Sequence, residues 1–289
     1  MSTCWLNGRI MPTAEAVIPV QDHGLLYGDG VFEGIRFYHR RPFRLPAHLD
    51  RLWSSARAID LVIPETPERL SAAIDELIAA QDEEHGYLRL VVTRGVGPLG
   101  LDPSRCTRPN IFVIADRLAL VPETSRDRGL TVVIASTRRL GPDGLDPRIK
   151  SLNYLNHILA RQEATRAGAD EALLLNGQGR VAEGSADNVF VVRSGRLLTP
   201  PVIEGALDGI TRACVLELAH EQGIPAAEVP LSPYDLHTAD ECFLTGTGAE
   251  LLPVATVDGR ALTACPGAVF QRLHAAYREL IRRETRDAD

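Results

Sequence analysis

The alternation of apolar and polar residues along the chain predicts short strands interleaved with amphipathic helices. In the first part, alternation with a period of two predicts strands, and apolar residues three and four apart predict helices. The predicted strands cover residues 4–12, 30–45 (folding back around "HRRP"), 87–95 and 110–116, and the predicted helices cover residues 46–63 and 66–81. A threonine, Thr66, followed by Pro67 and Glu68 gives the second helix a capping signal.

The second part repeats this mixture of strands and helices. Strands are predicted in 130–137, 171–200 and 241–257, and helices in 152–169, 210–223 and 267–284. The pattern favours an α/β (α+β) fold in two domains: residues 1–117, a polar linker over 118–128, and residues 129–289.

Composition and charge exclude several classes of protein. The chain is 45% hydrophobic and carries a net charge of −7. It can therefore build a core, while the acidic balance argues against binding to nucleic acid or to an anionic membrane surface.

Cysteine spacing and the N-terminal sequence indicate a cytoplasmic protein. The five cysteines are odd in number and form no C-x-x-C pair, which predicts reduced thiols and neither a disulfide framework nor a metal site. They are Cys4, Cys106, Cys214, Cys242 and Cys265. No signal-peptide pattern and no apolar run of membrane-spanning length is present.

Lys150, in "RIKSLN", is the only lysine among 31 basic residues. Arginine replaces lysine wherever only positive charge is needed, but not where a neutral primary amine must react. A genome that favours arginine codons also explains a single lysine. A reactive amine with a lowered pKa would suit attachment of pyridoxal phosphate, and Arg138, Arg139 and Arg148 are nearby cations in the sequence.

Pyridoxal phosphate needs an acid at its ring nitrogen and an anion site for its phosphate. Glu183, in "VAEGSADN", is a candidate acid, although it could also be a turn residue in solvent. For the phosphate, Gly209, Ile210 and Thr211 begin a predicted helix whose first N–H groups lack intrahelical partners. The turn "LTGTGAE", with Thr245 and Thr247, and a helical arginine, Arg51, are further candidates, and each alone is common in proteins.

Residues 21–38, "QDHGLLYGDGVFEGIRFY", interleave four glycines with aromatic and charged residues. Such a segment can line a ligand pocket, or it can form a glycine-rich hairpin with aromatic core residues.

Taken together and in this order, these motifs resemble the fold-type IV (class IV) pyridoxal-phosphate aminotransferases. The resemblance runs from "LNGRIMP" to the last helix. It is carried by "HGLLYGDGVFEGIR", "HLDRL", "IKSLNYLNHILARQEA", "AEGSADNVF", "GITR" and "FLTGTGAELLPV". It implies a smaller N-terminal α/β domain, a larger C-terminal domain, pyridoxal 5'-phosphate between them, and a homodimer or higher homo-oligomer.

The resemblance also implies a role for each matching residue. Lys150 would be the Schiff-base lysine and the base that moves the proton, and Glu183 would pair with the ring nitrogen. The phosphate would be held by Arg51, Gly209, Ile210, Thr211 and Thr247, while Tyr154 would bond the ring hydroxyl and Leu207 would pack on the ring. Substrate would be bound by Tyr27, Phe32, Arg36, Tyr87, Arg89, Gly248 and Ala249.

Within the family, the chain is similar to the branched-chain enzymes, which move the amino group of Leu, Ile or Val to 2-oxoglutarate. Tyr87 and Arg89 match an aromatic residue and an arginine of that branch. D-amino acid enzymes carry an Arg and a His in the loop after "TRG", and the 97–104 loop here has neither. D-amino acid or (R)-amine transamination, or a 4-amino-4-deoxychorismate lyase, are the alternatives. Two departures from the family are the three-residue spacing between Lys150 and Tyr154, and Ala213 where Asp is common.

Overall fold

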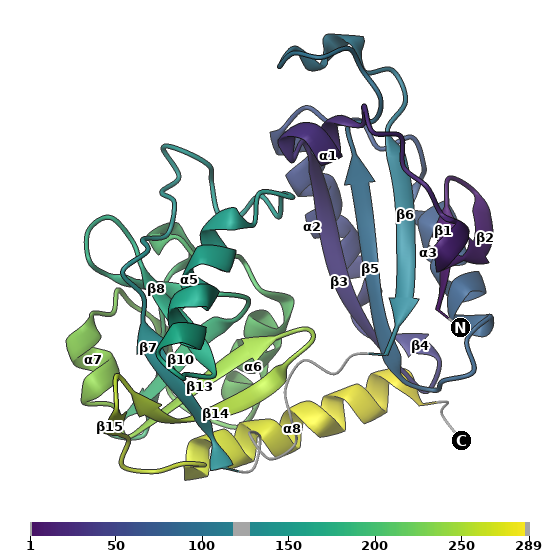
Figure 1. The fold of residues 1–289 in the computed structure, drawn as a ribbon. Coiled ribbons are helices and arrows are strands. Elements are labelled where there is room, and N and C mark those ends of the chain that lie inside the picture. Colours follow the sequence, from purple (N-terminus) through teal and green to yellow (C-terminus); the bar gives the residue numbers. More distant parts are fainter. Residues whose placement is uncertain (1, 118–127, 287–289) are drawn as a thin grey trace. The chain divides into compact units, whose positions relative to one another are not determined.

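The computed structural model describes residues 2–117 and 128–286 (Figure 1). Contacts group these residues into two units. Unit 1 contains residues 2–117, 149–153 and 281–286, and unit 2 contains residues 128–148 and 154–280. Apart from Arg128, the predicted linker lies outside the described residues, and the predicted domain division stays a prediction. The grouping differs from that division in giving residues 149–153 and 281–286 to unit 1.

Unit 1 is built on one antiparallel sheet with the strand order β2-β1-β6-β5-β3-β4 (Figure 1). Its strands lie where the alternation predicts them: β1 (Thr3–Leu6), β2 (Arg9–Pro12), β3 (Gly30–Tyr38), β4 (Arg41–Pro42), β5 (Gly86–Thr93) and β6 (Asn110–Asp116). The longest pairing joins β3 to β5 over eight residue pairs, from Gly30–Thr93 to Phe37–Gly86. These two strands therefore share a long register, and side chains opposite each other lie on the same face.

Two helices, α2 (Leu45–Ala58) and α3 (Pro67–Ala79), cover one face of this sheet. Alternate residues of β3, including Val31 and Ile35, pack in the same core as Leu52 of α2. The predicted Thr66 cap is present, because its hydroxyl accepts the Arg69 N–H at 3.2 Å. Unit 1 also contains three short elements that the sequence pattern did not reveal: η1 (Thr13–Glu15), α1 (His23–Tyr27) and η2 (Pro103–Arg105).

The predicted helix 46–63 ends five residues early, and Arg94 shows why. The carbonyls of Ile59 and Asp60 accept hydrogen bonds from the Arg94 guanidinium at 2.7 and 2.6 Å. Asp60 has a positive φ of 51°, which does not continue a helix.

Unit 2 contains a mixed sheet with the order β12-β11-β10-β13-β14-β7-β8-β9, and β15 pairs with β14. The pairs β14–β7, β7–β8 and β11–β12 are parallel, and the other pairs are antiparallel. The strands are β7 (Leu130–Ile134), β8 (Glu171–Leu175), β9 (Val181–Gly184), β10 (Asn188–Arg193), β11 (Arg196–Thr199), β12 (Ala226–Glu228), β13 (Glu241–Gly246), β14 (Glu250–Val257) and β15 (Arg260–Ala261).

The helices of unit 2 pack on its sheet through small and aromatic residues. They are α5 (Leu155–Arg166), η3 (Val202–Glu204), α6 (Ile210–Glu221), α7 (Pro233–His237) and α8 (Ala268–Thr285), whose last residues are grouped with unit 1. Ala160 and Ala164 of α5 pack against Ala172 and Leu174 of β8. The small alanines allow this helix to approach the strand closely.

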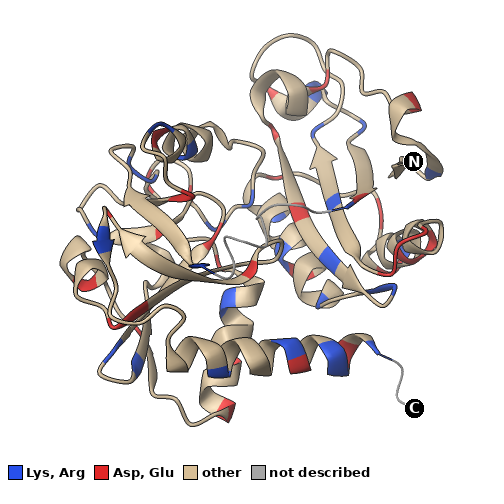
Figure 2. Cartoon of the chain, turned by 60° about the horizontal axis from the view of Figure 1, so that its bottom comes forward, with Lys and Arg blue, Asp and Glu red and all other residues tan. Residues whose placement is uncertain are grey.

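Charged residues of both signs are distributed over both units (Figure 2). Among residues 2–117 and 128–286, no helix combines the length and the apolar character needed to cross a membrane.

Candidate active site

Lys150 lies in a short segment, residues 149–153, that pairs with the first half of β3. The Phe32 N–H donates to the Lys150 carbonyl at 3.0 Å, and the Leu152 N–H donates to the Gly30 carbonyl at 3.0 Å. The Ile149 side chain packs against the core under the helices, while the Lys150 amine lies over the Phe32 ring. This pairing also explains why the helix predicted from residue 152 begins at Leu155.

The Lys150 amine and the guanidinium of an arginine both lie over the same aromatic ring. Its Nζ lies 4.5 Å from the centroid of Phe32, and the Arg89 guanidinium carbon lies 3.7 Å from the same centroid. Burial and then the Arg51 charge lower the pKa of Lys150 to about 8, against the opposing charges of Glu33 and Tyr87. At pH 7, roughly one amine in ten is then neutral and able to act as a nucleophile.

Arg139 and Arg148, which are near Lys150 in the sequence, do not lower its pKa, contrary to the interpretation from sequence. Arg148 pairs with Asp146 at 2.6 Å, and Arg139 pairs with Glu183 at 2.9 Å. The cations whose charge lowers the pKa of Lys150 are instead Arg51 and Arg89.

Four predicted substrate residues gather on the face of the sheet opposite the helices. Arg36 is directly opposite Tyr87, and Gly34 is directly opposite Arg89, so these side chains share the face that carries Phe32. Gly34 leaves space for the Tyr87 ring, because a Cβ at this position would lie 2.0 Å from the Tyr87 hydroxyl and displace it. The face thus combines a buried aromatic ring, a tyrosine hydroxyl and two arginines.

Tyr27 is the last residue of α1 and holds the loop at residues 97–104. Its hydroxyl accepts the Gly100 N–H at 3.0 Å, and the neighbouring His23 donates from Nε2 to the Pro98 carbonyl at 3.0 Å. The helix itself is fixed by the buried carboxylate of Asp22, which accepts the Gly24 N–H at 2.7 Å. Tyr27 therefore has a direct structural role in positioning that loop.

Arg51, the predicted phosphate ligand in α2, is paired with a fully buried carboxylate. Its Nε and Nη2 donate to Glu33 at 2.7 and 2.8 Å, and His48 donates from Nδ1 to the same carboxylate at 2.7 Å. Burial alone would raise the pKa of Glu33, but the Arg51 charge and the hydrogen bonds from Arg51 and His48 lower it to about 2. The motifs "FEGIR" and "HLDRL" contain Glu33 and His48, but the sequence alone indicates no role for either residue.

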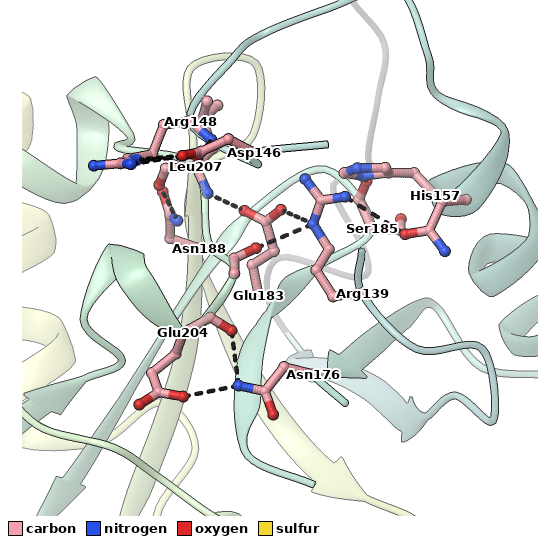
Figure 3. Close-up of polar contacts among 12 residues, drawn as sticks. Arg139, Asp146, Arg148, His157, Asn176, Glu183, Ser185, Asn188, Glu204 and Leu207 are labelled. Atoms are coloured by element: carbon pink, nitrogen blue, oxygen red, sulfur yellow. Dashed lines mark hydrogen bonds and ion pairs between the residues drawn. The ribbon is translucent and has the colours of Figure 1, made fainter. Parts of the chain in front are cut away.

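In unit 2, Glu183 of β9 is buried with both carboxylate oxygens occupied (Figure 3). Oε1 accepts from Arg139 Nε at 2.9 Å, and Oε2 accepts from the Leu207 N–H at 2.8 Å. Arg139 also donates to the Gly205 carbonyl at 3.1 Å. Glu183 is thus held in one orientation as an acceptor from two donors, as an ionised carboxylate is.

The helix α6 begins three residues after this carboxylate's partner, Leu207. The Leu207 carbonyl accepts from Asn188 Nδ2 at 2.9 Å, and a Cβ at Gly209 would lie 1.9 Å from Asn188 Oδ1. Gly209 is the N-cap residue, and Ile210 and Thr211 are the first two helical residues. The first N–H groups of a helix have no intrahelical acceptor, and together with the helix dipole they favour an anion.

The remaining predicted residues of unit 2 lie at a turn and at a helix start. Thr247 and Gly248 form the β13–β14 turn, and the methyl group of Ala249 is buried in the core of the unit. The Tyr154 ring stacks on His157 with 4.4 Å between centroids, and His157 is fixed by donating to the Ser185 carbonyl at 2.7 Å. Ala249 can therefore face a ligand only through its backbone.

The model of the family described as amino-transferase class IV matches residues 30–257. The chain belongs to this family. The family predicted from the sequence motifs is confirmed, and with it the assignment of the chain as an aminotransferase.

Individual class IV aminotransferases match nearly the whole chain. A putative branched-chain-amino-acid aminotransferase of Methanocaldococcus jannaschii is 47% identical over 96% of this chain and 95% of its own. The crystal structure of the Escherichia coli branched-chain amino acid aminotransferase has a TM-score of 0.94 at 33% identity, covering 99% of this chain and 96% of that one. The Thermobaculum terrenum branched-chain amino acid aminotransferase in its PLP (holo) form has a TM-score of 0.87 at 34% identity, covering 96% and 93%. The predicted α/β fold of type IV is confirmed by these similarities.

Because the pKa of Lys150 is lowered to about 8, its amine should react at a lower pH than an ordinary lysine does. Reductive methylation requires the neutral amine, so the modification rate of Lys150 in the cofactor-free protein should be half-maximal near pH 8. Because the Arg51 charge lowers the pKa, Arg51→Met should move this midpoint to higher pH. Mass spectrometry of the peptide that contains Lys150 separates it from the N-terminal amine. A midpoint near pH 10 would contradict this description of the site.

Proposed function

We propose that this protein is a branched-chain amino acid aminotransferase that uses pyridoxal 5'-phosphate and passes the amino group of Leu, Ile or Val to 2-oxoglutarate. The observation that carries the proposal is the chain's single lysine, whose amine lies over Phe32 with its pKa lowered to about 8. The names of the relatives, all branched-chain aminotransferases, support the choice of substrate.

The residues of the two units fit the chemical needs of pyridoxal phosphate. When bound, it supplies a carbonyl carbon that receives the amino group and a ring that takes up electrons. Lys150 offers the amine to which it attaches. Glu183 offers a fixed carboxylate for the ring nitrogen, and Gly209 leaves room at the start of α6 that a Cβ could not share with Asn188.

Each remaining predicted cofactor residue has a defined part in the proposal. Arg51, the Ile210 and Thr211 amides and the Thr247 hydroxyl bind the phosphate. Tyr154, oriented by its stacking on His157, donates to the ring hydroxyl, and Leu207 contacts the ring.

In this mechanism Lys150 would also move a proton. Its Nζ would take the proton from the substrate Cα and deliver it to the cofactor carbon that receives the amino group. A pKa near 8 leaves the amine basic enough to take the proton and neutral often enough to act at physiological pH. The carboxylate of Glu183 holds a proton on the ring nitrogen, which favours electron withdrawal from Cα.

The sheet face around Phe32 is the proposed substrate site. The ring provides an apolar surface for a branched side chain, and Arg36, Tyr87 and Arg89 can bind the second carboxylate of 2-oxoglutarate. Tyr27 positions the 97–104 loop, and the backbone of Gly248 and Ala249 binds the substrate carboxylate. Both substrates can then use one face because apolar and cationic groups lie side by side on it.

A homodimer and a cytoplasmic location are also part of the proposal. They rest on the family resemblance and on the sequence, including its odd number of scattered cysteines. Sedimentation of the purified protein at a mass of two chains would support the first.

The proposed reaction predicts turnover that depends on Lys150. With pyridoxal phosphate, L-leucine and 2-oxoglutarate, the protein should form glutamate, and Lys150→Ala should lose this activity because no amine remains to attach the cofactor and move the proton. Arg69→Ala, at an exposed helical position, is the control and should keep full activity. Faster spectral change of the bound cofactor with D-alanine or an (R)-aryl amine than with L-leucine would instead assign the protein to another branch.

The position of Glu183 predicts that its substitution lowers the rate of the reaction strongly and changes the binding of the cofactor little. Glu183→Gln removes the charge that keeps the ring nitrogen protonated, so kcat with L-leucine should fall about 100- to 1000-fold, the range seen when a fixed charge-stabilising group is removed. Glu76→Gln, at an exposed helical position, should leave kcat unchanged. Unaltered turnover in Glu183→Gln with cofactor bound would remove Glu183 from the mechanism.

A further inference from the structure

A buried cluster of three polar side chains lies between β3 and α2. We call Glu33, His48 and Arg51 the Glu33 cluster. The Glu33 and His48 side chains are 0% and 1% exposed, and the Arg51 side chain is 12% exposed. A carboxylate without solvent contact in the interior is costly unless its oxygens are paired, and here they accept three hydrogen bonds of 2.7–2.8 Å.

The geometry fixes both the proton on His48 and the charge of the cluster. An ionised carboxylate has no proton to give, so His48 must donate from Nδ1. Burial lowers the pKa of His48, and the charges of Arg51 and Lys150 lower it further, against Glu33. The histidine is therefore neutral, and the negative Glu33 and positive Arg51 give the cluster no net charge.

The pairing of Arg51 with Glu33 uses one edge of the guanidinium, that of Nε and Nη2. Because a guanidinium is planar and rigid, two bonds to one carboxylate also set the direction of the opposite edge, which carries Nη1. His48 supports this arrangement from behind by holding Oε2 of the same carboxylate.

We propose that Glu33 is a positioning residue for phosphate binding: held by His48, its carboxylate fixes Arg51 so that the opposite guanidinium edge donates to the phosphate of the cofactor. The inference rests on the proposed function, and it adds to it a residue that touches neither cofactor nor substrate. Since the pair carries no net charge, Arg51 binds the phosphate through directed hydrogen bonds rather than through excess positive charge.

Glu33→Gln tests the proposal, because an effect of the Arg51 charge and an effect of the Arg51 orientation would change phosphate binding in opposite directions. If excess positive charge mattered most, removing the Glu33 charge would strengthen phosphate binding. If position matters most, binding weakens, because a Gln side chain turns one N–H donor toward the guanidinium and cannot accept from both Nε and Nη2.

The test compares pyridoxamine 5'-phosphate with pyridoxamine, which differs only in lacking the phosphate. Their dissociation constants are measured by calorimetry on the full chain freed of cofactor, and their ratio isolates the phosphate contribution. This ratio should be about 10- to 100-fold smaller in Glu33→Gln than in the unaltered protein. Neither ligand forms a bond with Lys150, so the measurement is independent of catalysis.

Asp29→Asn is the matched control. Asp29 pairs with Arg94 through two hydrogen bonds of 2.9 and 3.0 Å, the same chemistry in the same unit. The Asp29→Asn variant should lose as much stability as Glu33→Gln does. Its ratio of the two dissociation constants should equal that of the unaltered protein. Glu33→Asp keeps the negative charge, but its side chain is one methylene group shorter, so the carboxylate lies farther from Arg51. This variant should therefore also reduce the ratio. This second variant decides the question if Glu33→Gln does not fold.

The outcomes separate the inference from the function on which it rests. An unchanged or larger ratio in Glu33→Gln and Glu33→Asp, or an equal fall in Asp29→Asn, would overturn the positioning role while the proposed function stands. If the unaltered protein itself does not prefer the phosphorylated ligand, the proposed function fails, and the inference fails with it. In an Arg51→Met background, Glu33→Gln should have no further effect on the ratio.

Discussion

The pairing of residues 149–153 with β3 determines where the reactive amine lies. Two backbone hydrogen bonds of 3.0 Å fix the register of this segment on β3, and a shift by one residue would move Lys150 away from the Phe32 ring. The apolar packing of Ile149 under the helices opposes such a shift. The lysine is thus held over the ring by pairing with β3, a strand that also contributes to the core of unit 1.

The two faces of β3 carry different sets of functional residues. The face under α2 holds the core and, within it, the Glu33 cluster, while the opposite face carries Phe32 and Arg36 beside Tyr87 and Arg89 of β5. Arg51 links the two sets electrostatically, because its charge is the second largest cause of the lowered pKa of Lys150. In unit 2, Glu183 is held by a comparable strategy, with Arg139 and the Leu207 N–H fixing its two oxygens.

Much of this arrangement follows from the sequence, and the exceptions have physical reasons. Periodicity located the long strands and helices, and the single lysine indicated the chemistry. Periodicity could not locate α1, which has only five residues, or reveal that Arg94 binds the carbonyls of Ile59 and Asp60 just past the end of α2. It also could not predict which arginines lie near Lys150, because Arg51 and Arg89 approach it through strand and helix packing and not through sequence proximity. Glu33 cannot be recognised from the sequence, because a buried glutamate in a strand is identified only by its partners, here His48 and Arg51 on α2.

The central claim is that Lys150 carries the cofactor, and reduction of the holoenzyme tests it most directly. Borohydride converts a lysine-bound pyridoxal phosphate into a stable pyridoxyl-lysine, which peptide mass spectrometry locates. The account predicts one pyridoxyl group per chain, on the peptide that contains Lys150. A protein that retains no pyridoxal phosphate, or that carries the group on its N-terminal amine, would contradict it.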